Sequence, residues 1–175
     1  MSRPDAWTPP GGPLIRYRSF RNGDPPALAA LWNRSLPAVG VVAPLSAHEL
    51  DALVMGKLGF DPEGLIVAED DGRVVAFALF FTNFSTFLAL PGLYLEDLYV
   101  EPEQRGRGIG KALLEHLARL AATRGYGRFE WSVLDWNADA IRFYQRMGAT
   151  VMPDWRICRI AGATLAAFAG PQPGR

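Results

Sequence analysis

Cysteine and histidine are scarce in this sequence. Its 175 residues include one cysteine, Cys158, and two histidines. One cysteine excludes a disulfide within the chain. Three such side chains cannot fill the four Cys and His positions of a structural zinc site. We therefore expect no metal and a buried, unreactive thiol at Cys158, within a strand.

Net charge and long apolar runs are also missing. Lys plus Arg and Asp plus Glu both total 18, which argues against a protein that coats nucleic acid or an anionic membrane. The longest apolar run, Val74–Phe81, has eight residues, whereas a membrane helix needs about 20. The start of the chain lacks the apolar core of a secretory signal. We expect a cytoplasmic protein with neither a nucleic-acid nor a membrane partner.

Proline and glycine mark the two ends of the expected domain. Four prolines fall within residues 1–13, at positions 4, 9, 10 and 13, which predicts a flexible leader. Residues 170–175 read as a flexible tail. The size and the 49% apolar content fit one domain with a real core over residues 14–169.

Hydrophobic periodicity predicts strands and helices mixed along that domain. A hairpin turn is expected at Asp70–Gly72. Asp24 is expected to cap a helix that has Pro25 at its first position. Expected strands cover residues 14–18, 65–68, 73–81, 93–100, 129–134 and 155–160, and further expected helices start at 46, 108 and 137. The fold class is therefore α/β or α+β with a substantial sheet.

The most informative segment is Gln104-Arg-Gly-Arg-Gly-Ile-Gly-Lys111, between an expected strand and an expected helix. Its alternate glycines allow sharp turns and a close approach of the backbone to a ligand. The first N–H groups of the helix lack partners within the helix and favour an anion. Arg105 and Arg107 add positive charge. The segment predicts a cradle for a pyrophosphate.

This segment also has three other interpretations. A glycine-bearing turn with solvated arginines explains it without any ligand. A nucleotide P-loop needs Ser or Thr after the lysine, where this sequence has Ala112. A dinucleotide-binding motif needs a third glycine one residue later than Gly110. The two nucleotide motifs therefore fail on spacing.

Residues 94–111 resemble the coenzyme A-binding core of the GNAT superfamily of N-acetyltransferases, with Arg105-x-x-Gly108-x-Gly110 as the matching pattern. Residues 135–137 and 143–149 resemble its second cofactor-contact block. Over residues 92–160 the chain is most similar to the spermidine/spermine (diamine) N-acetyltransferases. The resemblance implies a mixed, largely antiparallel central sheet with helices on both faces. It also implies that acetyl-CoA lies in a cleft between central strands.

The resemblance also implies roles for individual residues. Tyr144 matches the acid that protonates the departing thiolate, although core packing on an apolar helical stripe is its alternative. Asn137 matches a cofactor contact and also suits a helix N-cap. The implied cofactor-binding residues are Leu98, Tyr99, Val100, Arg105, Gly106, Arg107, Gly108, Ile109, Gly110, Lys111, Asn137, Ala140, Phe143 and Tyr144.

The base that deprotonates the amine is matched by Glu96, acting directly or through water. Glu96 and Asp97 are adjacent, so in a regular strand they point to opposite faces unless a β-bulge intervenes. We expect Asp97 to be the structural carboxylate of the two. Asp97 and water stay open as alternatives for the base.

The implied activity is transfer of the acetyl group from acetyl-CoA to a primary amine, most simply of a small molecule, through a ternary complex. A protein N-terminus or lysine as acceptor, and a non-catalytic acyl-CoA-binding module, are the alternatives. Residues 24–63 hold five acids, few for a polyamine site. A homodimer is open, since family members are often dimers.

Overall fold

The computed structural model of the chain describes residues 6–9, 14–21, 24–35, 46, 48 and 64–169. The chain divides into two compact units, Met1–Ser132 and Val133–Arg175. The first contains β1 (Ala6–Trp7), β2 (Arg16–Ser19), α1 (Pro25–Ser35), β3 (Leu65–Asp70), β4 (Arg73–Ser85), β5 (Leu90–Val100), the 3-10 turn η4 (Pro102–Gln104), α3 (Ile109–Thr123) and β6 (Arg128–Trp131). The second contains α4 (Ala138–Arg146) and α5 (Gly162–Ala167).

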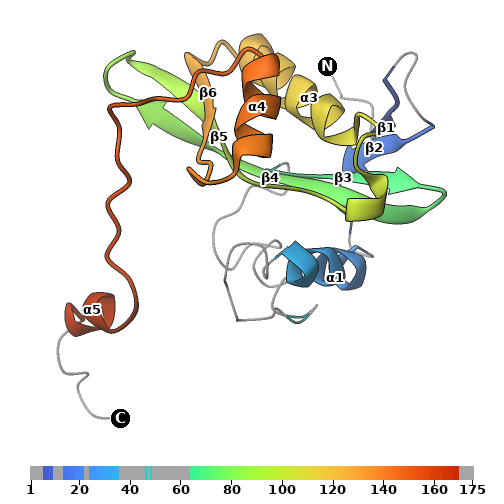
Figure 1. The fold of residues 1–175 in the computed structure, drawn as a ribbon, viewed down its shortest axis with the longest axis horizontal. Coiled ribbons are helices and arrows are strands. Elements are labelled where there is room, and N and C mark those ends of the chain that lie inside the picture. Colours follow the sequence, from blue (N-terminus) through green and yellow to red (C-terminus); the bar gives the residue numbers. More distant parts are fainter. Residues whose placement is uncertain are drawn as a thin grey trace. The chain divides into compact units, whose positions relative to one another are not determined.

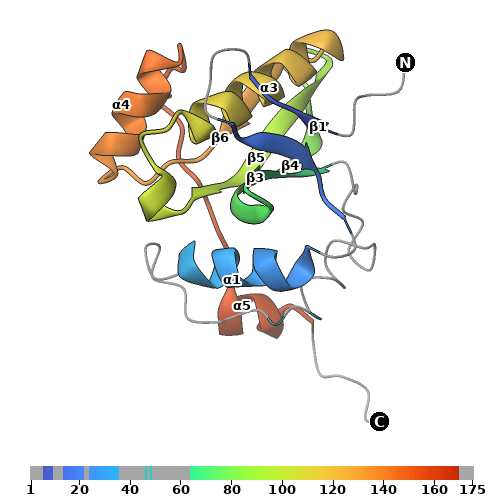
Figure 2. The ribbon, with the colours of Figure 1, turned by 90° about the vertical axis from the view of Figure 1, so that its right-hand side faces the viewer.

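The first unit is built on a six-stranded sheet in the order β1-β2-β3-β4-β5-β6. All neighbouring strands are antiparallel except β5 and β6, which are parallel. Helix α1 covers one face of the sheet and α3 covers the other (Figures 1 and 2). This arrangement confirms the expected mixed, largely antiparallel sheet with helices on both faces.

Apolar side chains bury the two helices against the sheet. On the α1 side, Leu28 and Leu31 pack in one cluster with Val67 and Phe77. The buried residues of α3 recur at helical spacing and include Leu113, Leu117 and Leu120. Each such side chain contributes about 1.5–3 kcal/mol when it is fully buried. The core therefore fixes both helices to the strands that carry the candidate site.

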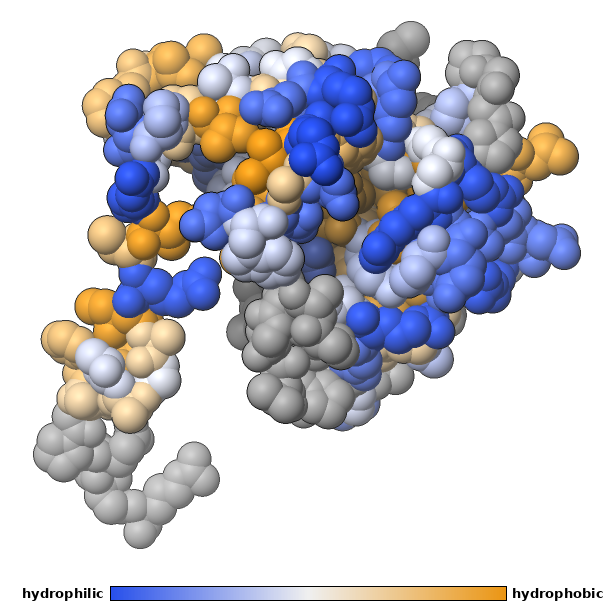
Figure 3. Space-filling view, in the orientation of Figure 1, coloured by the Kyte–Doolittle hydropathy of each residue, from blue (hydrophilic) through white to orange (hydrophobic). Residues whose placement is uncertain are grey.

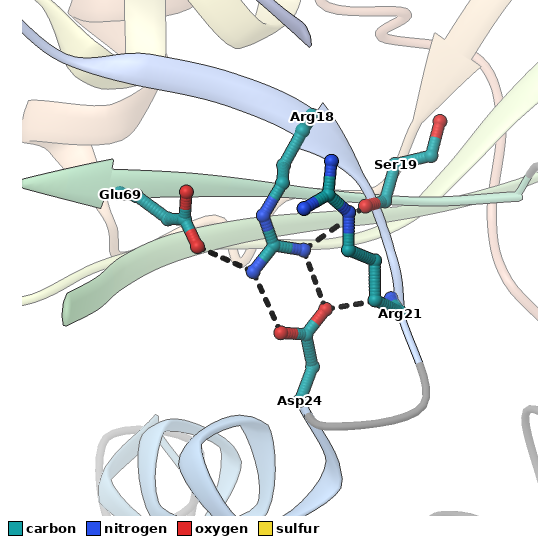
Figure 4. Close-up of polar contacts among 5 residues, drawn as sticks. All are labelled: Arg18, Ser19, Arg21, Asp24 and Glu69. Atoms are coloured by element: carbon teal, nitrogen blue, oxygen red, sulfur yellow. Dashed lines mark hydrogen bonds and ion pairs between the residues drawn. The ribbon is translucent and has the colours of Figure 1, made fainter. Parts of the chain in front are cut away.

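A buried ion-pair cluster joins β2, β3 and the start of α1 (Figure 4). The guanidinium of Arg18 donates to both carboxylate oxygens of Asp24, each at 2.7 Å, and also to Glu69. Asp24 additionally accepts a hydrogen bond from the backbone N–H of Arg21 at 2.7 Å, and its own carbonyl accepts from Leu28 N–H at 2.9 Å. The cluster therefore ties the first turn of α1 to the sheet.

Several sequence-based expectations were correct for the elements. The Asp70–Gly72 turn joins β3 and β4, α1 begins at Pro25, and α3 lies between caps at Gly108 and Arg124. The helix expected from residue 46 falls mostly outside the described residues. Strand β6 ends at Trp131, three residues before the expected end. Ala6–Trp7, in the expected leader, pair with β2.

The expected strand over residues 155–160 was wrong, because this segment has no regular secondary structure. The local sequence pattern favours a strand, but a strand forms only where another strand pairs with it, and no described strand pairs with this segment. Cys158 is exposed, so the expectation of a buried thiol in a strand was wrong as well. Helix α5, which follows, was not expected.

The tip of the β4–β5 hairpin carries exposed apolar side chains. Phe84 is 60% exposed, Phe87 85% and Leu88 49%. The tip is coloured as hydrophobic (orange) at the upper left of Figure 3.

Along the described ranges, every helix is too short or too polar to cross a bilayer.

Candidate active site

The predicted phosphate cradle is a loop between β5 and α3. Gly106 and Gly108 both adopt left-handed backbone conformations, with φ of 77° and 79°. A Cβ atom at either position would meet nothing within 4 Å, so space is open above both backbones. The first intrahelical bond runs from Ala112 N–H to Gly108 C=O at 2.9 Å. The preceding N–H groups of α3 are thus free of helical partners, and the loop fits a pyrophosphate.

The two arginines of the cradle are held by the protein in different ways. Arg105 donates from Nε to the carbonyl of Val100 at 3.1 Å. Arg107 donates from Nη1 to Asp70 Oδ2 at 2.5 Å and to Oε1 of Gln104. Hydrogen bonding from Arg107 lowers the pKa of the Asp70 carboxyl, and the same bond raises the pKa of Arg107. The charge of Arg107 is therefore matched by Asp70 at the end of β3.

Strand β5 offers backbone groups beside the cradle. It pairs with β6 only over Gly92–Leu95, opposite residues 128–131. Its continuation through Val100 pairs with β4 alone among the described residues. One edge of residues 96–100 is therefore open to an extended ligand at the point where the chain enters the cradle.

A β-bulge interrupts β5 at Glu96. Leu79 of β4 lies opposite Asp97, whereas the next residue, Phe80, lies opposite Leu95. Cross-strand partners share a face of the sheet and successive residues alternate, so Leu95 and Asp97 lie on opposite faces. Asp97 shares the face of Leu79, which packs in the α1 cluster. The regular alternation of the strand is therefore broken between Leu95 and Asp97 by a bulge, the exception that the sequence-based expectation allowed for.

The two carboxylates differ in their surroundings. Burial raises the pKa of the Asp97 carboxyl from 3.8 to about 6; the nearby Leu98 backbone N–H lowers it and the charge of Glu96 raises it. Glu96 is exposed. Tyr94 lies on the same face of the sheet as Asp97. The ring centroids of Tyr94 and Phe81 are 5.2 Å apart, and the Tyr94 hydroxyl shares a hydrogen bond of 2.9 Å with the Ser132 hydroxyl. Asp97 thus shares its face of the sheet with the aromatic side chains of Tyr94 and Phe81.

The remaining predicted residues lie in the second unit, on or beside α4. Asn137 caps this helix, its Oδ1 accepting from Ala140 N–H at 3.2 Å. The rings of Phe143 and Tyr144 are 5.4 Å apart. Positions 137, 140 and 144 lie three and four residues apart and therefore share one side of the helix. The N-cap interpretation of Asn137 is confirmed.

The structure thus groups the predicted residues in two sets. The first set runs from the bulge through the cradle in the first unit and consists of Glu96, Leu98–Val100 and Arg105–Lys111. The second set lies in the second unit and consists of Asn137, Ala140, Phe143 and Tyr144. Sequence reasoning missed Asp70, the partner of Arg107. These two residues are separated by 37 positions, and no local pattern links them.

Comparison with known proteins places these features in a family. The model of the acetyltransferase (GNAT) family matches residues 26–149. L-ornithine N5-acetyltransferase NATA1 of Arabidopsis thaliana is 47% identical over 99 residues, which cover 57% of this chain and 43% of that protein. Thialysine N-epsilon-acetyltransferase of Sus scrofa is 36% identical over 100 residues, covering 55% and 58%. The chain thus spans about half the length of these relatives.

A third relative aligns over more of the chain. Peptidyl-lysine N-acetyltransferase YjaB of Salmonella typhimurium is 30% identical over 139 residues, covering 79% of this chain and 85% of that protein. Among solved structures, an integron cassette protein from V. cholerae has a TM-score of 0.76 at 24% identity, covering 91% of this chain and 99% of the other. The family match extends over more than half of the sequence, and the chain belongs to the GNAT acetyltransferase family.

Proposed function

We propose that the protein transfers the acetyl group of acetyl-CoA to a primary amine of a small molecule. The observation that carries this proposal is the continuous run from the Glu96 bulge, along the open β5 edge, into the glycine cradle at the start of α3. Along one stretch of backbone, this run offers a carboxylate to accept a proton, a strand edge to pair with the extended arm of the cofactor, and N–H groups to bind its phosphates.

The open edge and the cradle would hold the cofactor, which supplies a thioester as the acetyl donor. The edge of residues Leu98–Val100 that β6 leaves unpaired offers backbone groups to the pantetheine arm, although the Val100 carbonyl already accepts from Arg105. Gly106, Gly108 and the first N–H groups of α3 offer donors and open space to the pyrophosphate. Arg105 retains its two Nη groups for a phosphate oxygen, because its bond to Val100 uses Nε.

Glu96 is proposed as the base. The attacking amine must be neutral, and its nitrogen forms the new C–N bond as the C–S bond of the thioester breaks. Glu96 accepts the amine proton directly or through water, which suits its exposed position. Asp97 is the second candidate, because burial brings its pKa to about 6, nearer to neutral pH.

Tyr144 is proposed as the acid that returns a proton to the departing thiolate. A phenol has an ordinary pKa near 10 and can therefore donate to a thiolate. Asn137 and Ala140 on the same side of α4, together with Phe143, are proposed as further cofactor contacts. Atoms and charges balance, since one proton leaves the amine and one reaches the sulfur.

The acceptor is proposed to be a small molecule with a side-chain amine, by analogy with the ornithine and thialysine relatives. A peptide lysine is the second candidate, because the peptidyl-lysine relative aligns with most of this chain. Both candidates present an alkylammonium group, which suits the acidic and aromatic residues beside the bulge.

An acceptor screen tests the proposal. Release of free thiol from acetyl-CoA would be followed with ornithine, thialysine, lysine, spermidine, tyramine and a lysine-containing peptide, each at saturating cofactor. We expect acetylated ornithine or thialysine to accumulate fastest, as identified by mass spectrometry. Faster acetylation of the peptide would support the second candidate. Cofactor binding without thiol release for any amine would identify a non-catalytic acyl-CoA-binding module.

A further inference from the structure

Arg107 and Asp70 join two loops that are far apart in sequence. Asp70 is the last residue of β3, opposite Arg73 at the first position of β4. The turn between them has φ of 48° at Asp71 and 75° at Gly72, positive at both central positions as in a type I′ hairpin turn. This short turn fixes the place of the Asp70 carboxylate at the end of the two central strands.

Arg107 lies between the two left-handed glycines of the cradle. Its Nη1 uses its N–H groups on Asp70 of the hairpin and on Gln104 at the start of the same loop. Its charge also acts on Tyr17 of β2, whose pKa burial raises to about 12 and the guanidinium lowers. One side chain therefore links the middle of the loop to its own beginning and to the neighbouring strands.

The pair carries no net charge. Asp70 is ionised at neutral pH, since the hydrogen bond from Arg107 lowers its pKa. An arginine whose charge is matched by a carboxylate at 2.5 Å adds little net attraction for a phosphate. Its evident contribution is to the shape of the loop, in which Gly106 and Gly108 would otherwise leave the backbone free to move.

We propose that Arg107 is a positioning residue that fastens the phosphate-binding loop to the β3–β4 hairpin through Asp70, and that cofactor affinity depends on Asp70 for this reason. The proposal rests on the proposed function in taking residues 105–111 as the cofactor cradle. It gives a role to Asp70, which lies outside the segments that resemble the family.

The sign of one substitution tests this proposal. Asp70→Asn leaves the positive charge of Arg107 unmatched. If Arg107 were a phosphate ligand restrained by Asp70, the variant would bind coenzyme A more tightly. If Arg107 positions the loop, binding weakens, by about two- to fivefold for a partly buried pair. The affinity for coenzyme A would be measured by calorimetry at low and high salt.

Asp71→Asn is the matched control, because it removes the same charge one residue away and asparagine tolerates a positive φ. We expect it to bind coenzyme A like the wild type. We expect Arg107→Gln and the double variant with Asp70→Asn to match the single Asp70 variant, since they break the same contact. Tighter binding by Asp70→Asn, additive losses, or a shallower salt dependence in Arg107→Gln would overturn the proposal.

Hydrogen exchange of the ligand-free protein gives a readout independent of the cofactor. Amides of residues 104–110 should exchange faster in Asp70→Asn than in the wild type or Asp71→Asn. Unchanged exchange in all variants would show that the pair does not order the loop. A wild type that fails to bind coenzyme A would refute the proposed function, and the exchange rates alone would then decide the anchoring role.

Discussion

The Asp97 carboxyl makes folding stability depend on pH in an unusual direction for an acid. Burial raises its pKa in the folded state to about 6, against 3.8 in the unfolded chain. Its contribution to stability is therefore fully present below about pH 3.8 and is lost as pH rises through about 6. As pH rises from below 3.8 to above 6, the free energy of unfolding of Asp97→Asn should therefore increase by about 3 kcal/mol relative to that of the wild type.

Urea unfolding of both proteins at pH 4 and pH 7.5 would measure this difference. Comparison of the two proteins at each pH cancels the titration of the other carboxylates. A stability difference that stays constant with pH would mean that the Asp97 carboxyl is solvated in the folded protein.

The two adjacent acids predict different pH profiles for the reaction. An alkylammonium titrates near pH 10, so at pH 7 about one acceptor molecule in a thousand is neutral. Glu96→Gln should therefore lower kcat/KM more at pH 7 than at pH 9, whereas Asp97→Asn should show a flatter profile. Steady-state rates between pH 6 and 9.5 would check this. The reverse result would make Asp97 the base.

Tyr144→Phe tests the proposed acid. The variant keeps the ring and removes only the hydroxyl, so the affinity for acetyl-CoA should be retained. Loss of a general acid lowers kcat by about 10²–10⁴-fold. Single-turnover rates would separate chemistry from product release. An unchanged chemical rate would return Tyr144 to a packing role on α4.

At the level of elements, the start of α3 depends on Gly108. This residue caps the helix in the left-handed region, with φ of 79°, and its Cα faces open space. A β-branched side chain is strained there and also occupies the space above the loop backbone. We expect Gly108→Val to fold and to lose acetyl-CoA binding, as measured by calorimetry. Gly125→Val, at φ of 69° just after the C-cap of α3, controls for backbone strain.

Elements with strong local signals could be predicted from the sequence. Pro25 after Asp24, the glycines around Arg107 and the apolar face of α3 each determine local conformation through backbone or capping geometry. The bulge at Glu96 and the Asp70–Arg107 pair depend on the register of distant segments, which local patterns do not encode. The strand expected over 155–160 failed for the same reason, since pairing needs a partner.

At the level of the whole molecule, a ligand that binds only the folded protein stabilises it by mass action. Acetyl-CoA at a hundredfold excess over its Kd should raise the free energy of unfolding by about 2.7 kcal/mol. Thermal unfolding with increasing acetyl-CoA would show this as a rising Tm. The same titration with Gly108→Val should leave Tm unchanged. A wild-type Tm that ignores acetyl-CoA would count against the cradle.

The order of the strands has a consequence for how the chain folds. Each strand of the sheet pairs with the next strand along the sequence, from β1 to β6. The β3–β4 and β4–β5 pairings close short loops, so these three strands can assemble as a meander while the chain is still emerging. The long separation between Ser19 and Leu65 makes the β2–β3 pairing the entropically costly step. We expect the β3–β5 meander to be the nucleus and the Arg18 cluster to form late, an order that pulse-labelled hydrogen exchange would resolve.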